Sequence, residues 1–126
     1  MKINLTGFKT KVDAGKTQIE LEHVFQPLED YEELKVHCTY LIPSEKTSYI
    51  AYDEKGKANV NFSDLFKSKV KKIEGLTIEI DGKDIPIATA DDLLALPANP
   101  ELDNIVTSTV LHLLKGNTLT ADEVKN

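Results

Sequence analysis

The side chains best suited to ligating a metal ion or transferring a proton are three histidines and one cysteine: His23, His37, His112 and Cys38. Zinc sites usually show a pair of ligands at a short, fixed spacing, and the sequence has no such pair. His37 and Cys38 are adjacent, so on a β-strand their side chains point to opposite faces and cannot share a metal ion. We therefore expect structural roles for all four residues, with Cys38 buried as a small hydrophobic side chain, and no metal site.

The motifs of common enzyme classes are missing from the sequence. Its six glycines are scattered rather than gathered in a phosphate-binding loop. Neither a nucleophile elbow nor an H-E-x-x-H helix occurs, and the segment 81–84 lacks the ligand spacing of an EF-hand. Abundant carboxylates leave open a small hydrolase-like enzyme whose acid–base pair is assembled only by the fold. The prediction is a protein that is not an enzyme, with no catalytic residue and no cofactor.

Two groups of residues are candidates for binding another protein. One is an acidic segment, which is either a docking face for a basic partner or a solvated surface; it comprises Glu29, Asp30, Glu32 and Glu33. The other is an apolar stripe at helical spacing, made of Leu102, Ile105, Val106, Thr109, Val110, Leu113 and Leu114. Such a stripe is more often core than interface, and it would bind a partner through Leu102, Ile105, Val106 and Val110 only if part of it stayed exposed.

A nucleic-acid partner is not expected. The net charge is −6, and all 15 basic residues are lysine, whereas arginine is the side chain suited to bidentate phosphate recognition. The lysines at 67, 69, 71 and 72 therefore indicate the polar face of an amphipathic helix rather than a nucleic-acid surface.

Length and composition predict one folded α+β domain over residues 1–126, β-rich in 1–62 and helix-rich in 63–126 apart from a hairpin at 76–87. A single cysteine rules out an intrachain disulfide. No apolar run reaches the ~20 residues of a membrane span, and the first residues lack a signal-peptide core. The expectation is a cytoplasmic protein without a membrane partner.

Local patterns predict antiparallel β-hairpins in the N-terminal and central parts, packed with C-terminal helices. Three hairpins are expected. Their arms are 2–12 with 17–25, 47–52 with 58–62, and 76–80 with 83–87, and the turn dipeptide Asp81-Gly82 joins the last two arms. The expected helices are 28–34, 64–73 capped by Ser63 and ended by Gly75, 90–96 capped by Thr89, 100–115 capped by Asn99, and a short one starting at Thr120. A further strand is expected over 35–42.

The second half also carries a family resemblance. Its elements are Val70-x-x-Ile73-x-Gly75-Leu76, Asp81-Gly82-Lys83, the segment Thr89-Ala90-Asp91-Asp92-Leu93, a C-terminal helix, and the ending Leu119-Thr120-x-x-Glu123-x-Lys125-Asn126. In this order they resemble the small tail assembly chaperones of long-tailed phages and prophages. The resemblance implies a non-catalytic protein in the host cytoplasm. Such a protein covers apolar surface on the tape-measure protein, or on tail-tube subunits, during assembly.

Three alternatives remain open from the sequence. The chain could be a structural virion subunit of a tail or head–tail connector, a small bacterial binding or regulatory protein, or the hydrolase-like enzyme considered above. A homo-oligomer is compatible with each of them.

Overall fold

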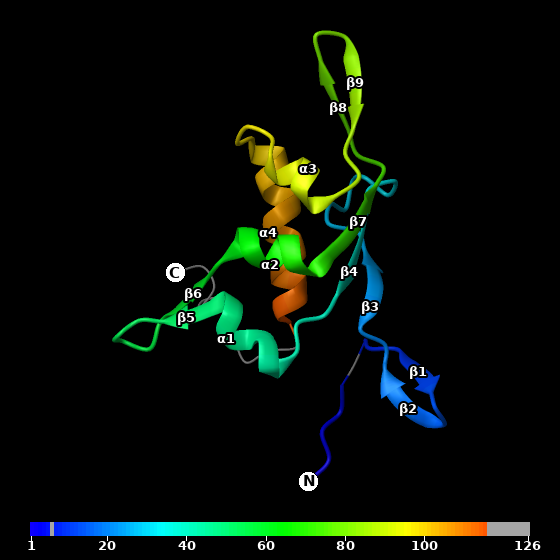
Figure 1. Cartoon of the computed structure of the whole chain (residues 1–126), viewed down its shortest axis with the longest axis vertical. Coiled ribbons are helices and arrows are strands. Elements are labelled where there is room, and N and C mark those ends of the chain that lie inside the picture. Colours follow the sequence, from blue (N-terminus) through cyan, green and yellow to red (C-terminus); the bar gives the residue numbers. More distant parts are fainter. Residues whose placement is uncertain (6, 116–126) are drawn as a thin grey trace.

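A computed structural model describes residues 1–5 and 7–115, and it is an α+β fold built around a three-stranded antiparallel sheet (Figure 1). The sheet has the order β3-β4-β7, with β3 at Glu22–Phe25, β4 at Lys35–Thr39 and β7 at Val70–Glu74. The central strand β4 buries Val36 and Cys38 on one face, as its alternating sequence predicts.

A β-bulge in β7 explains the main error of the sequence analysis. Cys38 pairs with Val70 and His37 pairs with Lys72, so Lys71 is an extra residue without a partner on β4. The bulge lets Val70 and Ile73, three residues apart, both be buried. That spacing imitates one face of a helix, which is why a helix was predicted to run through residue 73. The prediction was wrong from residue 70 onward.

Helix α2 spans Phe62–Lys69, and its first turn is capped by a residue other than the expected Ser63. The side chain of Asn61 accepts a hydrogen bond from the backbone N–H of Asp64 at 3.2 Å and donates one to its carboxylate at 2.8 Å. The observed cap therefore lies two residues before the predicted one, with the same chemistry.

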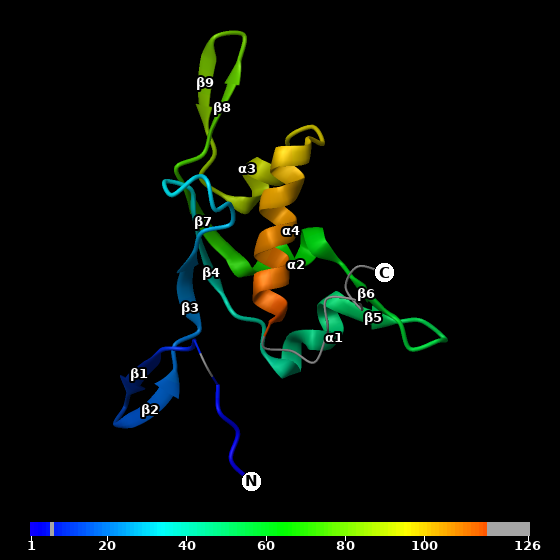
Figure 2. The same ribbon diagram turned by 180° about the vertical axis from the view of Figure 1, so that it is seen from behind.

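The two C-terminal helices follow the sequence prediction closely. Helix α3, Ala90–Leu94, starts with a capping box between Thr89 and Asp92. Helix α4, Pro100–Leu114, starts where the side chain of Asn99 accepts the N–H groups of residues 101 and 102. Helix α2 contacts both α3 and α4, and seen from behind α4 crosses in front of α2 (Figure 2). The expected helix at Thr120 lies outside the described residues.

Three two-stranded hairpins extend from this centre in different directions (Figures 1 and 2). They are β1–β2 (Thr10–Asp13 and Lys16–Ile19), β5–β6 (Ile50–Tyr52 and Ala58–Val60) and β8–β9 (Thr77–Ile80 and Lys83–Pro86). The turn of β8–β9 has φ of 52° at Asp81 and 77° at Gly82, as a type I′ turn requires. The predicted third hairpin is confirmed.

The N-terminal half differs from its prediction in three places. The first hairpin is shorter than expected, because the chain leaves it after Ile19 and forms β3, which pairs with β4. The segment 28–34 forms two successive turns instead of a helix, closed by hydrogen bonds from the N–H of Tyr31 to Leu28 and of Leu34 to Tyr31, both 3.2 Å long. Residues 43–49 are helical, with a 3₁₀ turn at Pro43–Glu45 and helix α1 at Lys46–Tyr49.

Like charges account for the missing helix at 28–34. In a helix, Glu29 would face both Glu32 and Glu33 across one turn, and such pairs destabilise a helix. A segment this short has too few hydrogen bonds to offset that cost.

One cluster of buried side chains runs through both halves of the chain. Its fully buried members are Val36 and Cys38 of β4, Leu65 and Phe66 of α2, and Thr109, Val110 and Leu113 of α4. Thr109 donates its buried hydroxyl to the carbonyl of Ile105 at 2.8 Å, so the polar atom in this core is satisfied.

Gly75 joins β7 to the third hairpin in a conformation that excludes other residues. Its φ is +77°, and an added Cβ would overlap the backbone carbonyl of Glu33. Gly56, in the turn of β5–β6, has a similar φ of +79° but open space around it. Gly75 is therefore required by both its backbone conformation and its contact with Glu33, and Gly56 by its backbone conformation alone.

We expect Gly75→Ala to destabilise the protein by at least about 2 kcal/mol more than Gly56→Ala. The positive φ costs both variants about 1 kcal/mol, and only Gly75→Ala must also push the 28–34 loop away. Urea unfolding followed by circular dichroism measures the two free energies. Equal losses would show that the contact with Glu33 is unimportant.

A second prediction concerns the ion pair between Glu45 and Lys69, whose lysine is only 8% exposed. Burial by itself raises the pKa of Glu45. It is outweighed by hydrogen bonds from Lys69 and from the Ile42 N–H and by the positive charges of Lys69 and Lys71, so the net pKa is lowered. A carboxyl group whose pKa is lower in the folded state stabilises the fold above its unfolded pKa. That contribution is lost as the pH falls through the folded pKa.

Stability should therefore decrease from about pH 5 downward, and less steeply in Glu45→Gln than in the parent protein. Urea unfolding at a series of pH values measures this slope. Glu54→Gln, at an exposed turn, removes the same charge without touching Lys69 and serves as the control. An unchanged slope in Glu45→Gln would refute the assignment.

Candidate functional site

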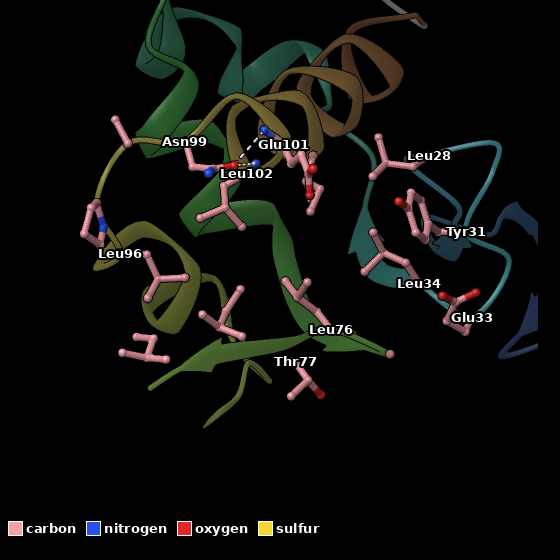
Figure 3. Close-up of a pocket in the computed structure, with 16 residues that line it drawn as sticks. Leu28, Tyr31, Glu33, Leu34, Leu76, Thr77, Leu96, Asn99, Glu101 and Leu102 are labelled. Atoms are coloured by element: carbon pink, nitrogen blue, oxygen red, sulfur yellow. Dashed lines mark hydrogen bonds between the residues drawn. The ribbon is translucent and has the colours of Figure 1, made fainter. Parts of the chain in front are cut away.

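An apolar groove of about 510 Å³ opens between three segments that are distant in the sequence (Figure 3). The first is the 28–34 loop, the second is the start of the β8–β9 hairpin, and the third is the link from α3 into α4. The groove is lined by Leu28, Tyr31, Glu33, Leu34, Gly75, Leu76, Thr77, Ile78, Ile80, Leu96, Pro97, Ala98, Asn99, Glu101, Leu102 and Ile105.

Each segment places its side chains in the groove for a local reason. Strand alternation puts Ile78 and Ile80 on one face of β8. The Asn99 cap fixes the first turn of α4, so that Leu102 and Ile105 lie one turn apart and both line the groove. The close approach of Gly75 to the backbone of Glu33 holds the loop against the hairpin.

The rim of the groove is acidic. Glu33 and Glu101 line it, while Glu29, Asp30 and Glu32 are exposed on the same loop. No lysine belongs to the lining residues that the structure describes. The groove therefore suits an apolar segment that carries positive charge beside it.

The two candidate binding groups of the sequence meet at this groove, but only in part. Leu102, Ile105 and Glu33 line it. Val106 is partly buried against the core and does not line the groove, and Val110 is fully buried with 0% exposure and offers no docking surface. Ile105 is 2% exposed and forms floor rather than rim.

Sequence reasoning missed the other lining residues, although one signal was present. The sequence patterns place Tyr31 in a helix and Leu76, Ile78 and Ile80 in a hairpin. They do not indicate which other element covers these side chains. The hairpin has a run of alternating apolar residues, yet Ile80 remains 47% exposed. A two-stranded hairpin has no second sheet layer to bury such a face.

A second group of side chains lies at the other end of α4. In the β3–β4 register His23 is opposite Cys38, and α4 brings His112 to the same place. The Nε2 atoms of His23 and His112 are 2.6 Å apart, and Cys38 Sγ is 3.4 Å from Nε2 of His23. The structure thus joins three residues that the sequence analysis treated as separate. His37 is not among them: its Nε2 lies 3.3 Å from Glu74 Oε2.

Burial keeps all three groups uncharged at neutral pH. Burial, the largest cause, together with electrostatic interactions with His23 and Lys115, lowers the pKa of His112 to about 4. Burial also lowers the pKa of His23, against a smaller opposing effect of its hydrogen bond to Leu21. The pKa of the Cys38 thiol rises to about 12 for the same reason. Cys38 is buried, as predicted.

The chain matches no protein-family model, no curated protein and no solved structure. Within residues 1–5 and 7–115, no helix combines the length and apolar character needed to cross a membrane.

Proposed function

We propose that this protein is a non-catalytic binding protein that holds an apolar segment of a partner protein in the apolar groove. The observation that carries the proposal is the groove itself: a concave surface of about 510 Å³, lined mostly by apolar side chains. Uncovered apolar surface of this kind is typical of interaction sites.

The acidic rim indicates the chemistry of the partner. A segment with apolar side chains facing the groove and lysine or arginine beside them would complement both floor and rim. An amphipathic helix is the simplest such segment, because its apolar residues three and four apart form one stripe.

The resemblance of residues 70–126 to tail assembly chaperones supports a particular partner. The tape-measure protein is the first candidate, and a tail-tube protein is the second. The protein would act in the host cytoplasm by covering apolar surface that otherwise aggregates before the tail is assembled.

One observation favours a second candidate function, that of a structural virion subunit. The three hairpins that extend from the centre carry exposed apolar side chains, among them Val12 on β1, Tyr52 on β5 and Ile85 on β9. Hairpin arms with exposed edges pair readily with neighbouring subunits. Stable rings of this chain in sedimentation experiments would favour this function over a transient chaperone.

The binding proposal is tested with a tape-measure protein and a tail-tube protein from the genome that encodes this chain. Tyr31, 50% exposed in the groove, is compared with Tyr52, 53% exposed on the β5–β6 hairpin. We expect Tyr31→Ser to weaken association at least about tenfold, which corresponds to about 1.4 kcal/mol, because aromatic anchors dominate such interfaces. Tyr52→Ser should leave the affinity within about twofold of the parent.

Isothermal titration calorimetry or co-purification measures both affinities. If neither protein associates with the chain, the tail-assembly proposal is refuted. If both tyrosine variants weaken binding equally, the groove is not the binding site.

A further inference from the structure

We propose that His23, Cys38 and His112 form a binding site for a Zn²⁺ ion. The thiol and the two imidazoles each offer one ligand atom, and these three atoms all lie within 4.8 Å of one another. The inference does not depend on what occupies the apolar groove.

The fold determines this convergence. Antiparallel pairing puts His23 directly opposite Cys38, so their side chains leave the sheet on the same face a few ångströms apart. The last turns of α4 cross that face and add His112. Two strands and one helix thus contribute one ligand each.

Hydrogen bonding orients the first imidazole for coordination. Nδ1–H of His23 donates to the carbonyl of Leu21 at 3.1 Å. Nε2 of His23 is therefore the unprotonated atom, and it is the one that faces Cys38 and His112. Metal-ligating histidines characteristically donate their other N–H to a carbonyl or carboxylate in this way, which fixes the tautomer.

Aromatic stacking holds both rings in place. The ring of His23 stacks on Tyr40 with centroids 3.7 Å apart and planes 12° from parallel. The ring of His112 stacks on Phe25 with centroids 4.0 Å apart and planes 7° from parallel. Each imidazole is therefore limited mainly to small shifts within its own plane.

Two of the three distances between ligand atoms are close to those that zinc requires, and the third, between Cys38 and His112, is at most 4.8 Å. Two nitrogens bound tetrahedrally at about 2.05 Å lie roughly 3.3 Å apart. The two Nε2 atoms, now 2.6 Å apart, would separate by roughly 0.7 Å to admit the ion. The 3.4 Å between Cys38 Sγ and His23 Nε2 is close to the roughly 3.6 Å expected for a sulfur and a nitrogen on one zinc ion.

The donor set selects the kind of ion. A thiolate and two imidazoles favour zinc and other thiophilic metals over Mg²⁺ and Ca²⁺, which prefer oxygen ligands. On binding, Cys38 releases its proton to solvent, and the resulting thiolate offsets one of the two positive charges of the ion. No fourth His, Cys, Asp or Glu joins the group within the described part of the chain, so water completes the tetrahedron.

The experiment uses the full chain, stripped of metal with a chelator and kept reduced, and then titrated with Co²⁺. Cobalt occupies zinc sites and reports thiolate ligation through a charge-transfer band in the near ultraviolet. We expect this band to saturate at one equivalent and to disappear when Zn²⁺ is added. Zn²⁺ should also raise the Tm of the protein.

His112→Gln tests the site with the least disturbance of the sheet, and His37→Gln is the matched control. His37 is next to Cys38 in sequence but points to the other face of the strand, where it meets Glu74. We expect His112→Gln, which removes a ligand, to weaken binding at least about tenfold, and His37→Gln to leave it unchanged. Far-ultraviolet circular dichroism verifies that both variants fold.

If a variant is unfolded, the proposal is tested by the Co²⁺ titration and the Zn²⁺-dependent Tm of the parent protein alone. Absence of the thiolate band, together with no Zn²⁺-dependent change in Tm, overturns the proposal. So does an equal loss of binding in His37→Gln and His112→Gln.

Discussion

The antiparallel pairing of β4 with both β3 and β7 is the interaction on which the rest of the structure depends. Among the described strands, β4 alone has hydrogen-bonded neighbours on both sides. Because its inner face is buried, its register is strongly constrained: a slip by one residue would move Val36 and Cys38 to the outer face. Pairing with β7 ends α2 at Lys69 and creates the bulge at Lys71. Pairing with β3 sets His23 opposite Cys38.

The apolar groove is a consequence of how the chain leaves this sheet. Directly after β7, the positive φ of Gly75 turns the chain outward into the β8–β9 hairpin, against the backbone of Glu33. The hairpin keeps Ile78 partly buried against the core and carries Ile80 away from it, where Ile80 is 47% exposed. The loop and the first turns of α4 form the remaining walls, and the loop supplies most of the surrounding carboxylates. Packing thus concentrates apolar surface and negative charge in one place.

Helix α4 connects the groove with the cluster formed by His23, Cys38 and His112. Leu102 lies in the groove and His112 in the cluster, ten residues or about 15 Å further along the helix axis. Between them, the helix buries Ile105, Thr109 and Val110 in the core. An ion bound at His112 would attach the last turns of this helix to β3 and β4. The helix that forms part of the groove would then be held at both ends.

The sequence by itself determined the features that depend on neighbouring residues: the Asp81-Gly82 turn, the caps at Thr89 and Asn99, the alternation of β4 and the α+β class. Each is set by interactions within a few residues, so its signal is local. Tertiary structure alone decided that residues 70–74 form a strand, because the bulge gives them helical spacing and only β4 supplies their hydrogen bonds. It also decided that the groove exists and that His23, Cys38 and His112 meet. The physical reason is that each of these requires groups separated by tens of residues, whose approach depends on strand register and helix packing rather than on sequence spacing.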